Sequence, residues 1–183
     1  MKTIIFDTET TGLTSTDEII ELAITDSKGK QLYLQRYKPN EEIHPAASRT
    51  TGIYNEMLDN EPTFADEYDK IVEIFNSCNK AQAYNASFDI RMLKQTCEKY
   101  NLCTDFIDNV EFECVMAMYS NYEYMSRYGD SSLEGPRNHK LGHACAQMGV
   151  KVQNAHEALG DCVMTAGLVQ AMQDEVNGNV KAS

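Results

Sequence analysis

The sequence predicts an α/β domain built on a mixed sheet, and three features support this prediction. In the first third of the chain, short apolar or alternating runs are typical of strands, at Thr3–Phe6, Glu18–Asp26 and Gln31–Tyr37. Turn residues at 26–29 favour an antiparallel hairpin between the second and third runs. From residue 80 onward, short strands alternate with helical segments, which is the pattern of parallel pairing.

The later elements follow from the spacing of their apolar residues. Two further strands are expected at Ala81–Tyr84 and Val110–Cys114. Helices are expected at Thr63–Phe75, about Ser87–Tyr100, after Cys114 through Met118, Lys140–Met148 and Asn154–Val176. The polar, tyrosine-rich stretch Asn121–Asn138 is interpreted as a long loop. One domain is therefore expected over residues 1–176, followed by a frayed tail at 177–183.

Composition and charge narrow the class of protein. The 183 residues include 28 acidic and 16 basic side chains, which gives a net charge of −12. This acidity argues against a broad basic surface that grips phosphate backbones, although bound divalent cations can supply positive charge locally. No signal-peptide core and no apolar run of membrane-spanning length occurs. The six cysteines form no C-x-x-C pair, which favours free thiols and a cytoplasmic location.

Asp7 and Glu9 lie two residues apart at the end of the first predicted strand. Side chains at this spacing on a strand point to the same face. Two buried carboxylates side by side raise each other's pKa unless a cation neutralises them, and all-oxygen ligands suit Mg²⁺ or Mn²⁺. The alternative is that both acids only cap the turn at residues 10–12.

Three more polar residues are candidates, and each alone favours a structural role. Asp89 lies in the first turn of a predicted helix, where an acid is also favoured by capping and by the helix dipole. Asp161 lies on the flank of the apolar stripe of the last helix, so it could equally be a surface acid. His156 lies near the start of that helix, where histidines are commonly surface residues or caps.

Considered together, these residues resemble the DEDDh group of 3′–5′ exonucleases, which includes the proofreading epsilon subunits of DNA polymerases and ribonuclease T-like enzymes. The similarity lies in three segments: FDTETTGL (Asp7, Glu9), YNASFD (Asn85, Asp89) and HEALGD (His156, Asp161). Weaker similarity at residues 51–57 and 140–150 extends the resemblance from Thr3 to about Val169. Thr51 stands where the family often has a histidine, and residues 121–138 have no assigned counterpart.

The resemblance implies a ribonuclease-H-like fold with helices on both faces of a five-stranded mixed sheet, in which a three-strand antiparallel meander precedes two parallel strands. It also implies a site for two Mg²⁺ or Mn²⁺ ions that clamp the attacking and leaving oxygens of the reacting phosphate. Asp7 would bridge both ions, Glu9 and Asp161 would complete the first site, and Asp89 would serve the second. His156 would be the general base, since the ordinary pKa of histidine, near 6.5, suits this work at neutral pH.

The resemblance further implies contacts with the substrate by Thr8, Thr10, Leu13, Ile53 and Asn85. Thr8, Thr10 and Leu13 would line the pocket for the terminal nucleotide, and Leu13 and Ile53 would pack against bases. For Leu13 and Ile53, ordinary core packing is the alternative. Asn85 would hold its loop or touch a phosphate. Two small basic patches, residues 137–140 and Arg127 among tyrosines, would attract single-stranded nucleic acid.

The expected function is metal-dependent removal of nucleoside 5′-monophosphates from 3′ ends of single-stranded DNA or RNA. No membrane partner is expected, whereas a polymerase or another protein partner and the oligomeric state stay open.

One alternative is a phosphatase of the haloacid dehalogenase type, because FDTETT resembles the opening of its motif. Thr165 stands where that class has its second late acid, which argues against it. The other alternative, a non-catalytic nucleic-acid-binding module on the same fold, would be expected to have lost one of the five site residues.

Overall fold

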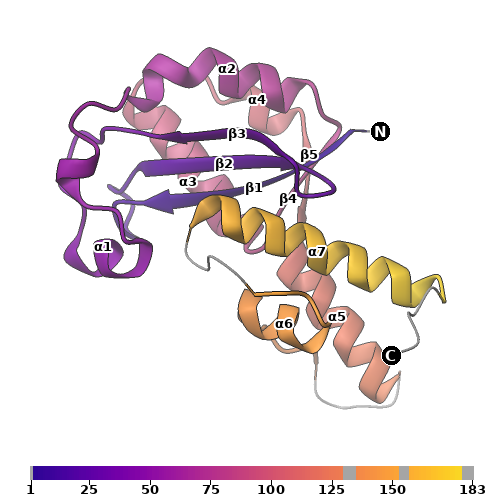
Figure 1. Ribbon diagram of the computed structural model, residues 1–183. Helices are drawn as coiled ribbons and strands as arrows, with labels where there is room; N and C mark the ends of the chain where they lie inside the picture. Colours follow the sequence, from indigo (N-terminus) through magenta and orange to yellow (C-terminus); the bar gives the residue numbers. More distant parts are fainter. Residues whose placement is uncertain (1, 130–134, 153–156, 179–183) are drawn as a thin grey trace.

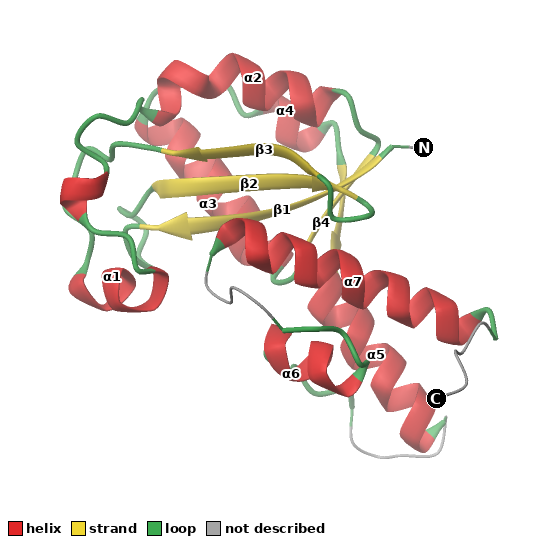
Figure 2. Ribbon diagram, viewed as in Figure 1, coloured by secondary structure: helices red, strands yellow, loops and turns green. Residues whose placement is uncertain are grey.

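The computed structural model describes residues 2–129, 135–152 and 157–178, and a five-stranded sheet forms its centre (Figure 2). The strands are β1 (Thr3–Thr10), β2 (Ile19–Asp26), β3 (Gln31–Arg36), β4 (Lys80–Ala83) and β5 (Glu111–Cys114). Their order across the sheet is β3-β2-β1-β4-β5. The β3-β2-β1 pairs are antiparallel and the β1-β4-β5 pairs are parallel. The predicted mixed sheet is confirmed.

Helices cover both faces of this sheet, as Figure 1 shows. The described helices are α1 (Pro45–Thr51), α2 (Phe64–Asn76), α3 (Ala86–Lys99), α4 (Asp105–Asp108), α5 (Val115–Tyr128), α6 (Leu141–Gln147) and α7 (Ala158–Val176), with a 3-10 turn at Asn55–Met57. The apolar side chains of α2, α3 and α4 pack on one face. Helix α7 crosses the other face over β1 and β2. In the described part of the chain, no helix combines the length and the apolarity needed to cross a membrane.

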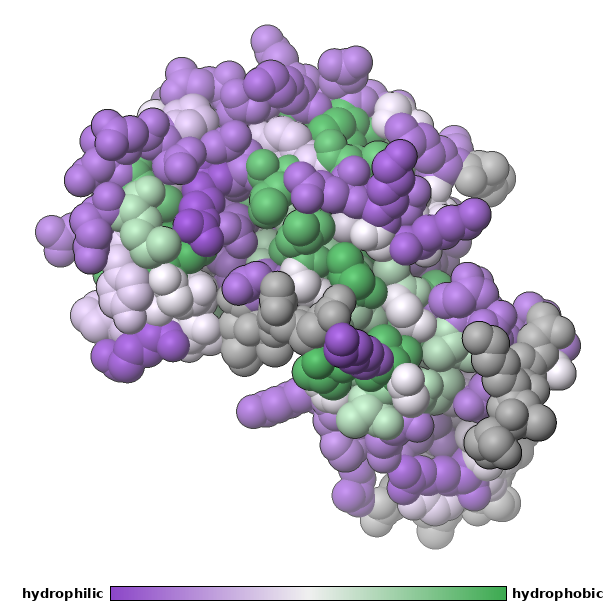
Figure 3. All heavy atoms as spheres, in the orientation of Figure 1, coloured by the Kyte–Doolittle hydropathy of each residue, from purple (hydrophilic) through white to green (hydrophobic). Residues whose placement is uncertain are grey.

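The alternation of β1 divides the core between the two faces. Ile4 and Phe6 point into the larger cluster, where the Phe6 ring meets the Phe75 ring edge-on at a centroid distance of 5.4 Å. Ile5 points to the opposite face and packs against α7. A further cluster joins α5, α6 and α7, with Tyr119 and Leu168 among its buried members. On the face drawn in Figure 3, hydrophilic residues cover most of the surface, and hydrophobic ones form a band from the sheet towards these three helices.

The structure corrects three boundaries of the predicted elements. Strand β1 continues to Thr10, because residues 7–10 pair with β2, so Asp7 and Glu9 lie within the strand. Helix α5 continues to Tyr128 through the first part of the predicted loop, because packing of Tyr119 against α7 stabilises a segment of modest helix propensity. Helix α7 begins at Ala158, with Glu157 at its N-cap position; the predicted cap Asn154 lies outside the described residues. Helices α1 and α4 were not expected.

Candidate active site

The first two acids lie on the face of the sheet that α7 covers. In the antiparallel register, Asp7 pairs with Ala23, and Glu9 pairs with Glu21. Ile5, which shares the face of Asp7 and Glu9 by alternation, packs with Ala23 and with α7. Both carboxylates are therefore directed towards the space beside the first turn of α7.

Helix α7 can approach this face closely because the residues between them are small. Ala158, Cys162 and Ala166 are buried against Ile5 and Ala23. The thiol of Cys162 lies 3.5 Å from the carbonyl oxygen of Ala23 and 3.7 Å from that of Ile5, so the helix rests on the strand backbones. Asp161 precedes Cys162 in the first turns of the helix and is half-buried. The packing of α7 thus brings Asp161 next to the acids of β1.

Asp89 reaches the same region from α3. It lies in the first turn of this helix and is only 3% exposed. Its Oδ1 accepts hydrogen bonds from the backbone N–H of Thr8 at 3.1 Å and from the Thr8 hydroxyl at 2.8 Å. Because Thr8 lies between Asp7 and Glu9, these bonds tie α3 to the strand segment that carries the first two acids.

The electrostatics of the site are those of crowded carboxylates. Burial raises the pKa of Asp7 well above its ordinary value, and the negative charges of Asp89, Glu9, Asp161 and Glu21 raise it further. Burial, and then the same kind of repulsion, raises the pKa of Glu9 to about 8. Burial raises the pKa of Asp89 to about 7, although its two hydrogen bonds from Thr8 oppose the shift. Side chains that favour the protonated form near neutral pH are suited to binding a compensating cation.

The donor set fits a hard divalent cation. Carboxylate oxygens are the preferred ligands of Mg²⁺ and also suit Mn²⁺, and the groups that perturb Asp7 are all carboxylates. Among the described residues, no three acidic, histidine or cysteine side chains already converge as a preformed metal cluster. Repulsion between uncompensated carboxylates opposes such convergence. The suitability of this site for a divalent cation therefore rests on the chemistry and the electrostatics of its acidic side chains.

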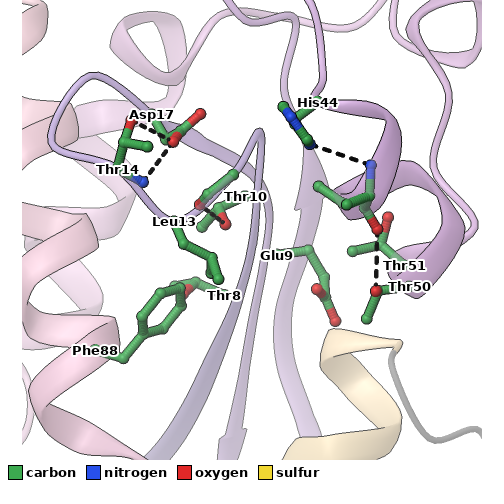
Figure 4. Close-up of a pocket in the computed structure, with 13 residues that line it drawn as sticks. Thr8, Glu9, Thr10, Leu13, Thr14, Asp17, His44, Thr50, Thr51 and Phe88 are labelled. Carbon is green, nitrogen blue, oxygen red and sulfur yellow. Dashed lines mark hydrogen bonds between the residues drawn. The ribbon is translucent and has the colours of Figure 1, made fainter.

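A cavity of about 480 Å³ opens beside Glu9 (Figure 4). Leu13 and Phe88 form one side of it, and Thr50 and Thr51 of α1 form the opposite side, with Glu9 between them. The small side chains of α1 leave room between the two walls, and the volume falls within the range of about 300–1,000 Å³ that is usual for small-molecule sites. The cavity can hold a mononucleotide-sized group next to the carboxylates.

The loop that carries Leu13 is held in place by hydrogen bonds. The Oδ2 of Asp17 accepts bonds from the backbone N–H of Thr14 at 2.6 Å and from its hydroxyl at 2.7 Å. From α3, Arg91 donates to the carbonyl oxygens of Leu13 and Thr14, each at 3.4 Å, and Gln95 donates to that of Thr14 at 3.0 Å. Leu13 itself is 76% exposed, so a bulky apolar side chain projects from a fixed loop into the opening of the cavity.

The remaining predicted residues fall in different places. Thr8, Thr10 and Leu13 line the cavity, and their contact with a terminal nucleotide stays a prediction. Ile53 is 1% exposed and packs with Ile20, Ile43 and Leu58, which favours the core-packing alternative. Asn85 occupies the N-cap position of α3, and its Oδ1 accepts a bond from the Ser87 hydroxyl at 3.3 Å. His156 lies outside the described residues.

Several residues of the cavity and of the site were not predicted from the sequence. His44 lines the cavity from the N-cap of α1, and Phe88 lines it from the residue before Asp89. Glu21 is buried beside Glu9, and the signal for it was available: a charged residue inside an otherwise apolar strand needs a partner. The two basic patches meet in a second cavity of about 210 Å³, lined in part by Arg127, Arg137 and two tyrosines.

Comparison with known proteins gives consistent matches. A model of the RNase T family, described as exonuclease, matches residues 4–169. The uncharacterized exonuclease CP81 of Escherichia phage 186 is 35% identical over 173 residues, which cover 92% of this chain and 87% of the relative. The DNA polymerase III subunit epsilon of Treponema pallidum is 30% identical over 180 residues, which cover 91% of this chain and 74% of the subunit.

Among solved structures, the zinc-bound complex of Escherichia coli exonuclease I with single-stranded DNA aligns with a TM-score of 0.77 at 18% sequence identity. The alignment covers 95% of this chain and 40% of exonuclease I, so this chain corresponds to less than half of that protein. At this identity the likeness shows the fold, a ribonuclease-H-like sheet with helices on both faces.

Proposed function

The chain belongs to the RNase T exonuclease family, and from this premise we propose that it removes nucleoside 5′-monophosphates stepwise from the 3′ ends of single strands, using two divalent cations. It is an enzyme of the 3′–5′ exonuclease class, and thus a phosphodiester hydrolase. The proposal concerns the finer points: the product, the preference for single strands, the number of cations and the role of each residue.

One observation carries the proposal: crowded, partly or fully buried carboxylates that raise one another's pKa lie next to a nucleotide-sized cavity. As a group, Asp7, Glu9, Asp89 and Asp161 repel one another, which is unfavourable for folding unless a cation compensates their charge. A phosphodiester at the cavity end nearest Glu9 would lie beside the four acids. The terminal nucleoside would then occupy the space between Leu13 and the threonines of α1.

The acids of this site would hold divalent cations in the arrangement that the resemblance implies. Asp7, Glu9 and Asp161 would bind one ion, and Asp7 and Asp89 would bind the other. When bound, two such ions activate a water molecule and stabilise the charge that develops on the phosphate and on the leaving 3′ oxygen. The backbone N–H and hydroxyl of Thr8 hold Asp89 at a fixed position, so this acid is preorganised for its task.

His156 would act as the general base that takes the proton from the attacking water. This residue lies four positions before Gly160 and five before Asp161, just ahead of α7. The assignment comes from the resemblance.

The preference for single strands is supported by the shape and lining of the two cavities. The first offers apolar surface for one base, at Leu13 and Phe88. The second combines two arginines and two tyrosine rings with Glu123, which pairs with Arg127 at 2.8 Å; arginines beside aromatic rings are the kind of surface on which unpaired bases stack. The second cavity is linked to the sheet, because the Tyr84 hydroxyl, just after β4, donates to the carbonyl oxygen of the lining residue His139 at 2.6 Å.

Proofreading beside a polymerase is a second candidate setting for the same activity. The similarity to a polymerase III epsilon subunit favours it. In that setting the substrate is a mismatched DNA primer end, whereas a free-standing nuclease could trim DNA or RNA.

The test is digestion of 5′-labelled single-stranded DNA, duplex DNA and RNA of the same sequence, with Mg²⁺ or with excess chelator. We expect ladders that shorten from the 3′ end, nucleoside 5′-monophosphates as products and faster loss of the single strands. Activity in excess chelator would contradict the cation mechanism. Products with 3′-phosphates would contradict the assigned leaving oxygen.

A further inference from the structure

A further carboxylate, the buried Glu21, borders the site but takes no part in the chemistry described above. It lies on β2, is 5% exposed and stands directly opposite Glu9 in the antiparallel register. Its charge adds to the repulsion that raises the pKa of both Glu9 and Asp7. A buried charge in this position is unfavourable unless it does something that a neutral residue could not.

Both oxygens of Glu21 are engaged by groups on other elements. Its Oε2 accepts a bond from the Nε of Arg36 on β3 at 2.7 Å. Its Oε1 accepts a bond from the backbone N–H of Ala158, the first residue of α7, at 3.3 Å. A continuous chain of contacts therefore runs from β3 through β2 to the start of the helix that carries Asp161.

Among the residues that the structure describes at the start of α7, Glu21 supplies the side-chain cap that the N-cap residue does not. The N-cap residue, Glu157, makes no side-chain capping bond. The first N–H groups of a helix lack partners within the helix, and the positive end of the helix dipole favours a carboxylate there. Glu21 supplies this carboxylate from the sheet. Ala158 and Asp161 are three residues apart, so they are neighbours on the helix surface.

We propose that Glu21 is a positioning residue: it caps α7 from the sheet and fixes Asp161 against Asp7 and Glu9, while Arg36 holds its second oxygen away from the cation site. The inference rests on the proposed cation site, in which Asp161 is a ligand. Groups that orient metal ligands in this way typically change metal affinity by about 10–100-fold when they are removed.

Three variants distinguish a capping role of Glu21 from a role through its charge or as a cation ligand. Glu21→Ala removes the cap. The double variant Glu21→Gln with Arg36→Met keeps an acceptor for the Ala158 N–H but removes both charges. Glu113→Ala is the matched control, because Glu113 on β5 also accepts from neighbouring side chains, Lys80 and Gln82 of β4.

Two readouts are needed: the Mn²⁺ dissociation constant from calorimetric titration, and amide hydrogen exchange in the first turns of α7 without metal. For Glu21→Ala we expect Mn²⁺ affinity about tenfold weaker or more, and faster exchange at residues 158–162. The double variant should stay within about threefold of wild type in affinity, with near-normal exchange. Glu113→Ala should melt at a lower temperature and bind Mn²⁺ normally.

The proposal is overturned if Glu21→Ala matches wild type in both readouts. It is also overturned if the double variant loses as much affinity as Glu21→Ala, because Glu21 would then act through its charge or as a ligand. A wild type without Asp7-dependent Mn²⁺ binding would instead contradict the proposed function. The exchange measurement would still decide whether Glu21 caps the helix.

Discussion

Asp89 shows how one residue can link the fold to the chemistry. Both of its hydrogen bonds from Thr8 fall on the same oxygen, Oδ1, so the other oxygen takes no part in them. The bonds hold the carboxylate beside β1 and oppose the upward shift of its pKa. A cation ligand that is oriented before binding loses less entropy when the cation arrives.

The role of His156 leads to the first prediction. His156→Ala should lose the proton-transfer contribution, a rate decrease on the order of 10²–10⁴-fold. Its residual activity should rise with pH, because hydroxide needs no base. Binding of Mn²⁺, measured by calorimetric titration, should be close to that of wild type. If the substitution abolished Mn²⁺ binding and left the pH dependence of residual activity unchanged, His156 would be a ligand or a structural residue.

In helix α7, the spacing of apolar residues did not predict where the helix begins or how Asp161 is placed. The apolar stripe predicted for this helix is Leu159, Cys162, Val163, Ala166 and Val169. Three of these residues are buried, whereas Leu159 and Val163 are only partly buried. Met164, Leu168 and Met172 are buried as well, because α5 and α6 pack on the side that faces away from the sheet. A helix covered on two sides has no single apolar stripe, so neither its start nor the exact setting of Asp161 could follow from periodicity.

The loop between β1 and β2 leads to the second prediction. Leu13→Ala should raise KM by about tenfold, since a base would lose its apolar contact. The free energy of unfolding should change by less than about 0.5 kcal/mol, because the side chain is 76% exposed. Steady-state kinetics and thermal melting measure the two effects. Leu32→Ala, at an exposed leucine of β3, is the control and should leave KM unchanged. A core role for Leu13 would instead lower stability and spare KM.

The third prediction concerns the second cavity and the helix α5 that borders it. Arg137→Gln should raise KM for long single strands without changing kcat. It should also reduce the slope of log KM against log salt by about 0.7, the contribution of one phosphate contact on a single strand. Lys28→Gln, in the exposed β2–β3 turn, removes the same charge and should change neither quantity. An unchanged salt slope for Arg137→Gln would exclude this cavity from the path of the strand.

At the scale of the whole molecule, the sheet followed from the sequence because its strands are local and strongly patterned. The five strands and their pairing agree with the prediction. The acids of the site could be named because three short motifs resemble one family. His44 and Phe88 could not, because their places beside the cavity depend on contacts between residues far apart in the chain. Glu21 could have been singled out as a charged residue in an apolar strand, but its contact with Ala158 could not be predicted.

The raised pKa values of the site acids lead to the fourth prediction. It concerns how the stability of the metal-free protein depends on pH. The pKa of Glu9 rises on folding from 4.5 to about 8, so the folded state keeps this proton to a higher pH than the unfolded chain does. The contribution to stability is complete below about pH 4.5 and is lost as the pH rises through about 8. In chelator, the melting temperature should therefore fall over this range, and Glu9→Gln should flatten the fall. Added Mn²⁺ should stabilise wild type more at the upper end. A melting temperature that rose with pH in chelator would contradict the assignment.

The central claim is that the four clustered carboxylates are needed for hydrolysis of the 3′ end, and Asp7→Asn tests this claim. Burial and four neighbouring acids raise the pKa of Asp7. Asparagine keeps the size of the side chain and removes the charge, so the variant should melt at least as high as wild type in chelator. The melting temperature therefore shows whether the variant is folded, so that a loss of activity is not mistaken for a loss of folding.

The deciding measurement is the initial rate at which Asp7→Asn releases nucleoside 5′-monophosphates from single-stranded DNA or RNA with Mg²⁺. We predict a rate lower than that of wild type on the order of 10³-fold or more, because the remaining acids cannot hold the cations in place. A folded Asp7→Asn protein that hydrolyses 3′ ends at close to the wild-type rate would contradict the account, since the acid at the centre of the site would then not be needed for the reaction.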